Sequence, residues 1–167
     1  VIVLALNELV IPVMHDGQHG TASISTAGLS NASERSGKKF EEIKVVVSGG
    51  GAAGIASARM YRKLGVKNII LVDSKGVVKK KRTDLNQYKR EFVSDTQADT
   101  LKEAMKDEDV FLGLSAPKIL DDEMIVSMAK YPVIFALANA ITEVMPETVA
   151  SLRLDVIAGT GKSDYPK

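Results

Sequence analysis

Short apolar runs alternate along this chain with longer segments in which polar and apolar residues are mixed. The apolar runs predict five strands, at residues 44–48, 69–73, 109–115, 132–137 and 155–158. The mixed segments predict helices at about 52–64, 97–106, 121–128 and 147–152, and a long charged connection at 76–91. Strands that are apolar along their whole length are typical of a parallel sheet with both faces covered. We therefore expect an α/β protein with a doubly wound parallel sheet.

The first 36 residues have a different pattern. Residues 1–12 are apolar and predict a short buried helix or strand that Pro12 ends. The polar stretch from His15 to Ala22 contains two glycines and predicts a loop. Thr21 is then the expected N-cap of a helix at 22–36, which has few large apolar residues.

The stretch Val45–Ala56 gives the strongest indication of chemistry, because a run of valines leads into clustered glycines and an alanine-rich helix. Three of the glycines have the G-x-G-x-x-G spacing of dinucleotide-binding folds. The first permits a tight turn, the second lets a diphosphate approach the backbone, and the third lets the helix pack closely on the sheet. The first-turn N–H groups of such a helix face the phosphates. We expect the pyrophosphate to be held by Gly49, Gly51, Ala52, Ala53 and Gly54.

A second apolar run, at 68–72, ends in Asp73, which is 19 positions after Gly54. A carboxylate at about this distance accepts hydrogen bonds from the ribose of the adenosine half in dinucleotide-binding folds. The alternative is that Asp73 is a turn residue at the end of a strand. The preceding glycines favour the ribose role.

The ends of the predicted strands carry the other candidate binding residues. In open parallel sheets, ligands bind beyond the carboxyl ends of the strands. Four strand ends are therefore expected to border one crevice, at Ser48 to Gly51, Asp73, Ser115 to Pro117, and Asn139.

Composition narrows the function classes. The 167 residues suit one domain, and 22 basic against 21 acidic side chains argue for neither nucleic acid nor an anionic membrane as a partner. The absence of cysteine excludes disulfides, thiolate catalysis and cysteine metal sites, and is compatible with a reducing compartment. Only 5% of residues are aromatic, which disfavours a stacking platform for single-stranded nucleic acid.

The apolar N-terminus is too short to span a bilayer and has no basic region of the kind that begins a signal peptide. The chain begins with Val1 rather than Met. We therefore expect a fragment or an incomplete sequence.

Four segments in order along the chain resemble the nicotinamide-binding half of bacterial-type malic enzymes, and the similarity covers nearly the whole chain. They are residues 11–22, 43–76, 135–139 and 160–166. The resemblance implies a Rossmann-like NAD(P)-binding domain within a larger two-domain enzyme. It makes residues 1–36 part of a catalytic or linker segment, and residues 37–167 a C-terminally incomplete cofactor domain.

The resemblance implies oxidative decarboxylation of L-malate to pyruvate and carbon dioxide, with NAD or NADP as the hydride acceptor and Mg²⁺ or Mn²⁺ as the cation. It also implies a cytoplasmic homodimer or higher oligomer. Asp16 matches an acid that supports catalysis beside the metal, and we take it as the metal ligand of this chain. Asn139 is expected at the nicotinamide and malate, and Ser115 and Ala116 at the nicotinamide.

Two departures from the family pattern affect these expectations. The family has two consecutive acids where this chain has Asp16 and Gly17, and the second acid is the usual metal ligand. The sequence from Asn139 to Glu143 also lacks the two prolines of the family. Both changes are typical of a degenerate copy or an imperfect sequence, and the first is expected to lower metal affinity sharply.

Three other motifs have weaker interpretations. His15 and His19 have a spacing that can bind zinc on a helix, but the neighbouring glycines favour a loop. The basic run at 78–82 is either a solvated loop or a site for the 2′-phosphate of NADP. Asp73 would repel that phosphate, which favours NAD over NADP. Ser115 lacks the G-x-S-x-G context of a hydrolase nucleophile.

Two alternatives to a malic enzyme remain open. One is a non-catalytic or degenerate dinucleotide-binding module, which Gly17 favours. The other is the cofactor domain of an amino-acid dehydrogenase, which shares the fold and needs no metal.

Overall fold

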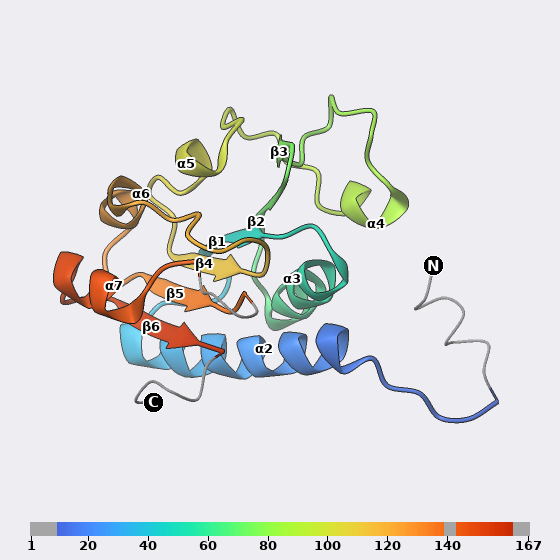
Figure 1. Cartoon of the computed structure of the whole chain (residues 1–167), viewed down its shortest axis with the longest axis horizontal. Coiled ribbons are helices and arrows are strands. Elements are labelled where there is room, and N and C mark those ends of the chain that lie inside the picture. The colour runs from blue at the N-terminus through green and yellow to red at the C-terminus, as the bar shows by residue number, and fades with distance from the viewer. Residues whose placement is uncertain (1–9, 139–142, 162–167) are drawn as a thin grey trace.

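The computed structural model of the chain describes residues 10–138 and 143–161, and its centre is a six-stranded sheet in the order β3-β2-β1-β4-β5-β6 (Figure 1). Neighbouring strands are parallel, except that β3 runs antiparallel to β2. This arrangement confirms the doubly wound α/β prediction. The strands are β1 (Lys44–Ser48), β2 (Asn68–Asp73), β3 (Gly76–Val77), β4 (Val110–Gly113), β5 (Val133–Ala136) and β6 (Ile157–Thr160).

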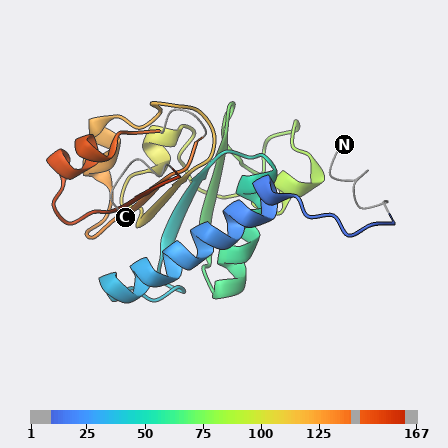
Figure 2. The ribbon, with the colours of Figure 1, turned by 60° about the horizontal axis from the view of Figure 1, so that its bottom comes forward.

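Helices cover both faces of the sheet. The long helices α2 (Asp16–Ser36) and α3 (Ala52–Leu64) lie across one face, as Figures 1 and 2 show. Buried residues of α6 and α7 belong to the cluster on the other face. The shorter helices are α4 (Gln87–Arg90), α5 (Leu101–Ala104), α6 (Asp122–Ser127) and α7 (Pro146–Leu152).

The alternation of side chains along β1 divides the core into two clusters. Val45 and Val47 pack with residues of α2 and α3, whereas Val46 packs with residues of β4, α6 and α7. All three valines are fully buried. This explains why the strand is an uninterrupted apolar run rather than an alternating one.

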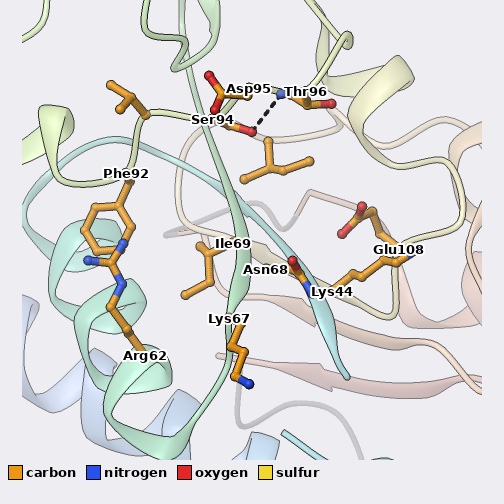
Figure 3. A pocket seen from close by; sticks show the side chains of 12 residues that line it. Lys44, Arg62, Lys67, Asn68, Ile69, Phe92, Ser94, Asp95, Thr96 and Glu108 are labelled. Atoms are coloured by element: carbon orange, nitrogen blue, oxygen red, sulfur yellow. Dashed lines mark hydrogen bonds between the residues drawn. The ribbon is translucent and has the colours of Figure 1, made fainter. Parts of the chain in front are cut away.

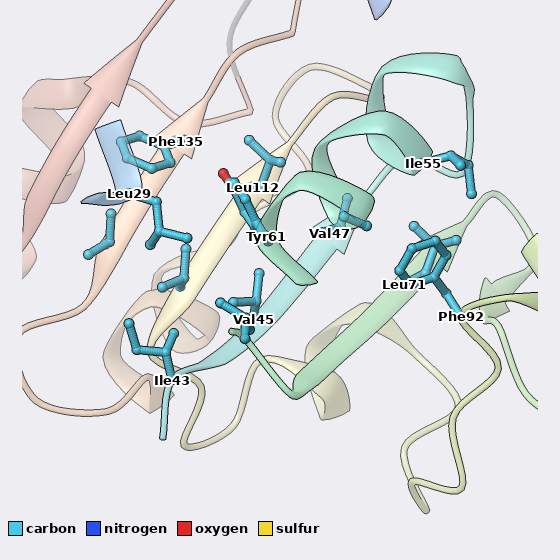
Figure 4. Packing of buried hydrophobic residues seen from close by; sticks show 14 of the residues in the cluster. Leu29, Ile43, Val45, Val47, Ile55, Tyr61, Leu71, Phe92, Leu112 and Phe135 are labelled. Carbon is cyan, nitrogen blue, oxygen red and sulfur yellow. The ribbon is translucent and has the colours of Figure 1, made fainter. Parts of the chain in front are cut away.

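Tyr61 of α3 is fully buried in the cluster that lies between the sheet and helices α2 and α3 (Figure 4). Its hydroxyl donates to the backbone oxygen of Ser25 in α2, at 3.3 Å. Gly28 of α2 faces the ring of Phe135, and a Cβ at that glycine would lie 3.0 Å from the ring. The small and polar residues of α2 therefore allow it to pack close to the sheet.

The predicted loop at His15–Ala22 is wrong, because α2 begins at Asp16. The N–H groups of Gln18 and His19 already donate to the backbone oxygen of His15. Thr21 is thus inside the helix and is not its N-cap. Two glycines in the first turns each cost about 1 kcal/mol of helix propensity, and burial of the rest of α2 outweighs this.

Other boundaries also differ from the predictions. The connection at 76–91 contains β3 and α4, and the helix predicted at 97–106 is the four-residue α5, preceded by a capping box at Thr100. The last strand is two residues later than predicted. Val10 and Ile11 are exposed and belong to no helix or strand, contrary to the predicted buried element, whereas residues 1–9 lie outside the described residues.

Within the described residues, no helix is both long and apolar enough to cross a membrane.

Candidate functional site

The carboxyl ends of β1, β2 and β4 open into a cavity of about 540 Å³. Its lining brings together most of the strand-end residues that the sequence singled out. They include Ser48, Gly49, Gly50, Gly51, Asp73, Ser115 and Ala116. Lys89 of α4 also lines this cavity, and the sequence analysis did not identify it.

Each glycine of the motif occupies a place that a side chain would disturb or fill. Gly49 has φ 128°, and its N–H donates to the backbone oxygen of Val72. A Cβ at Gly54 would lie 1.8 Å from the backbone oxygen of Gly49, so only glycine fits there. A Cβ at Gly51 would have no atom of the described residues within 4 Å. The backbone at Gly51 is therefore open to a ligand.

The N-terminus of α3 begins directly after this open position. Gly51 is its N-cap, and no side chain within residues 10–138 and 143–161 caps the helix. The N–H groups of Ala52, Ala53 and Gly54, in the first turn, have no partner in the preceding helical turn. With the helix dipole, they suit a diphosphate. The cavity, the open Gly51 and the uncapped helix together fit a dinucleotide.

Asp73 lies at the end of β2, and donors already surround its carboxylate. Oδ1 accepts from Arg82 Nη1 and from the backbone N–H of Lys75, both at 2.9 Å. Oδ2 accepts from Arg82 Nη2 at 3.1 Å and from Lys89 Nζ at 2.5 Å. A carboxylate has about four acceptor positions, so these four donors fill them.

The same contacts set the charge of Asp73. Burial raises the pKa of this carboxyl, but the hydrogen bonds from Arg82 and Lys89 outweigh burial and hold the pKa at about 2. Asp73 is therefore ionised at neutral pH, and two cations compensate its charge. A ribose hydroxyl can bind it only after one donor moves.

The basic run at 78–82 is not uniformly a solvated loop. Lys79 is buried, and its Nζ donates to Asp99 at 2.7 Å and to the backbone oxygen of Gln97. Arg82 joins Asp73 to Asp84. Lys80 and Lys81 are exposed, as a solvated loop requires. The run thus supplies Arg82 to the neighbourhood of the expected ribose.

Ser115 and Ala116 line the cavity after β4, where the nicotinamide side was expected. The Oγ atoms of Ser48 and Ser115 are 3.0 Å apart, which joins the ends of β1 and β4. Asn139 lies outside the described residues, so its role stays a prediction.

Glu143 is a fully buried acid beside these strand ends, and no sequence motif predicted a role for it. Its Oε2 accepts the backbone N–H of Ala138 at 3.1 Å. A Cβ at Gly113 would lie 2.4 Å from the Glu143 carboxyl carbon, so the glycine that ends β4 makes room for the acid. Burial raises the pKa of Glu143. The side chain links the end of β5 to the end of β4.

Asp16 is the first residue of α2, and its carboxylate lies over Gly20, where a Cβ would be 2.1 Å from Oδ1. It does not line the dinucleotide cavity. The described residues contain no group of three His, Cys, Asp or Glu that could hold a metal ion. They therefore do not form a complete site for Mg²⁺ or Mn²⁺, and the role of Asp16 stays a prediction.

The two histidines lie at the start of α2. His19 is inside α2 and His15 is its N-cap, so the loop predicted for them is wrong. Their spacing now lies on a helix, but the described part of the chain supplies no cluster with a third ligand.

Comparison with known proteins identifies the family. The family model described as "Malic enzyme, NAD binding domain" matches residues 18–161. An NADP-dependent malic enzyme of Rhizobium meliloti is 49% identical over 159 residues, which are 93% of this chain and 21% of that protein. An NAD-dependent malic enzyme of Geobacillus stearothermophilus is 48% identical over 163 residues, which are 95% of this chain and 34% of that protein.

A solved structure agrees with these matches. The crystal structure of an NAD-dependent malic enzyme from Thermotoga maritima has a TM-score of 0.88 and 41% identity, over 96% of this chain and 44% of that one. The chain thus spans between a fifth and less than half of these three relatives. With a matching family model over most of its length, the chain belongs to the family of malic enzyme NAD-binding domains.

Proposed function

We propose that this chain is the cofactor-binding part of an enzyme that oxidatively decarboxylates L-malate to pyruvate and carbon dioxide. The observation that carries the proposal is the open backbone at Gly51 beside the uncapped N-terminus of α3, in a chain of the malic enzyme family. A nicotinamide cofactor supplies the hydride acceptor for such a reaction. The chain spans less than half of its relatives, so the activity is a proposal for the whole protein.

The residues of this chain bind and orient the cofactor. The first-turn N–H groups of α3 hold the diphosphate, while Ser115 and Ala116 border the nicotinamide. Asn139 is proposed to contact both nicotinamide and malate. Asp73 accepts the adenosine ribose after Lys89 Nζ leaves Oδ2, because Lys89 is a single flexible donor and Arg82 is held by two carboxylates.

NAD is the proposed form of the cofactor, because the Asp73 carboxylate disfavours a 2′-phosphate. Arg82 and Lys89 reduce this preference by compensating the charge of Asp73. The relatives include both NAD-dependent and NADP-dependent malic enzymes. Separate calorimetric titrations with NAD and NADP measure the preference.

A divalent cation is part of the proposed reaction, with Asp16 as the ligand from this chain. The described residues hold no complete metal site, so we assign no catalytic step to the cation. Hard oxygen ligands such as a carboxylate suit Mg²⁺ or Mn²⁺.

Malate-dependent formation of NADH by the whole protein, in the presence of Mn²⁺, tests the activity. Turnover supports the proposal. The second candidate is a non-catalytic dinucleotide-binding module, which Gly17 favours because it stands where the family has a metal-binding acid. NAD binding without turnover supports that candidate, and absence of NAD binding contradicts both.

A further inference from the structure

A second cavity lies at the opposite edge of the sheet, at the amino ends of β1 and β2 (Figure 3). Its volume is about 470 Å³, within the range typical of small-molecule sites. It shares no lining residue with the dinucleotide cavity. The segment at 92–96 forms part of its wall. Any ligand here is separate from the cofactor.

Three cations line this cavity, namely Lys44, Arg62 and Lys67. Arg62 is held in place, since its Nη2 donates to the backbone oxygen of Glu91 at 2.9 Å and its guanidinium lies 4.2 Å from the centre of the Phe92 ring. Among the described residues, neither lysine forms an ion pair within 4 Å. Their charges are therefore available to an anionic group.

Glu108 is the second observation that points to a ligand. It lines the cavity, its residue is only 8% exposed, and its Oε2 has no hydrogen-bond partner among the residues that the structure describes. A buried polar atom without a partner destabilises the fold, and such atoms are uncommon in folded proteins. Burial raises the pKa of Glu108 to about 7, although Lys44 opposes the shift. A protonated Glu108 can donate a hydrogen bond to a ligand.

The remaining polar lining favours hydroxyl groups. Asn68, Ser94 and Thr96 contribute amide and hydroxyl groups to the wall. Asp95 is exposed on the same segment and is the other acid of the lining. The hydroxyl oxygens of Ser94 and Thr96 already accept the backbone N–H groups of Thr96 and Ala98. Their O–H groups can still donate to a hydroxylated ligand.

We propose that this cavity is a second binding site, which takes a small hydroxylated organic anion. Lys44 and Lys67, which form no ion pair among the described residues, hold the acidic group, and Glu108 with the neighbouring amide and hydroxyl groups holds the ligand hydroxyls. A phosphate and a carboxylate share the chemistry that these lysines recognise.

The test is an NMR titration of the ¹⁵N-labelled chain with glucose 6-phosphate, gluconate, glucose and inorganic phosphate. We expect glucose 6-phosphate or gluconate to shift the amide signals of residues 67–70 and 92–96. Whichever of these two ligands binds more tightly shows whether the site prefers a phosphate or a carboxylate. Glucose lacks the charge and inorganic phosphate lacks the hydroxyl-bearing carbon chain. Both are expected to bind at least about fivefold more weakly, glucose because it loses the charge contacts and phosphate because it loses hydrogen bonds. Equal binding of either one overturns the proposed ligand class.

Variants test the assigned residues. Replacing both Lys44 and Lys67 by alanine should raise the apparent Kd at least about fivefold. Lys63→Ala, an exposed lysine of α3 outside the cavity, should leave it unchanged. Glu108→Leu should weaken binding while raising the thermal midpoint, because it removes a buried unpaired oxygen.

Three outcomes overturn the proposal. They are the absence of shifts with both organic anions, shifts confined to residues 48–54 of the dinucleotide site, and equal affinity in the double lysine variant. None of them depends on malate turnover or NAD binding, so failure here is distinct from failure of the proposed function.

Discussion

Asp73 decides the interpretation of the cofactor site at the residue scale. Asp73→Ala removes the proposed acceptor of the ribose hydroxyls, and we expect it to weaken NAD binding by about 1–3 kcal/mol. It also leaves Arg82 and Lys89 without this carboxylate, so NADP binding should fall less than NAD binding or increase. Calorimetric titration of the variant with each cofactor measures both effects.

Asp84→Ala is the matched control for Asp73. It removes the other carboxylate of Arg82, at 2.8 Å, but Asp84 does not line the cavity. NAD affinity should therefore change little in this variant. If Asp73→Ala leaves NAD affinity unaltered, the ribose assignment is wrong and Asp73 serves mainly to hold Arg82 and Lys89.

Gly17 determines a second property at this scale, the binding of a divalent cation. Within the described part of the chain, a Cβ at Gly17 would meet only the His15 ring, at 3.4 Å, so an acid fits there. Gly17→Asp is expected to tighten Mn²⁺ binding about tenfold or more, because it adds a carboxylate beside Asp16. Electron paramagnetic resonance of free Mn²⁺ measures the affinity. Gly17→Asn has similar size without the charge, and equal affinity in both variants would refute the expectation.

At the scale of single elements, substitutions at two glycines at the start of α3 are expected to affect folding and cofactor binding separately. Gly54→Ala places a Cβ 1.8 Å from the Gly49 oxygen and should destabilise the fold by about 1–3 kcal/mol or more. Gly51→Ala meets no atom of the described residues within 4 Å, so thermal unfolding should change by less than about 1 kcal/mol. Its methyl group occupies the approach of the diphosphate, and NAD affinity should fall. Normal NAD binding by Gly51→Ala would exclude the proposed diphosphate position.

The elements also show why some predictions succeeded. Strand β1 and helix α3 are determined by local sequence, because an apolar run, a glycine turn and an alanine-rich segment specify them within the 21 residues from Lys44 to Leu64. The start of α2 is different. Gly17 and Gly20 favour a loop locally, but packing of Leu29 and Ala32 against the core keeps the long helix in place. Tertiary packing of this kind is not visible in a local pattern.

The candidate site also contains residues that a local sequence pattern could not identify. Gly49, Gly51 and Asp73 are each recognisable from spacing, and the structure brings them to one cavity. Lys89 was missed because it reaches Asp73 from 16 residues along the chain, on a short helix without a motif. Glu143 was missed because its role depends on the space left by Gly113. Contacts between distant segments determine both residues.

For the whole molecule, two carboxyl groups with pKa values shifted in opposite directions predict how the free energy of unfolding depends on pH. The pKa of Asp73 is lowered from 3.8 to about 2, so its stabilising contribution is complete above pH 3.8 and is lost as pH falls through 2. A shift of this size corresponds to about 2 kcal/mol. Acid unfolding is therefore expected to reflect the loss of the contacts between Asp73 and its two cations.

Glu108 has the opposite effect on how stability depends on pH. Its pKa rises from 4.5 to about 7, so between these values the folded protein binds more protons than the unfolded chain, and stability falls as pH increases. The full shift corresponds to roughly 3 kcal/mol. Glu108→Gln cannot ionise and should flatten the decline of unfolding free energy between pH 4.5 and 7. Urea unfolding at several pH values measures it, with the exposed Asp95→Asn as control. An unchanged slope in Glu108→Gln would mean that Glu108 ionises in the folded protein as readily as in the unfolded chain.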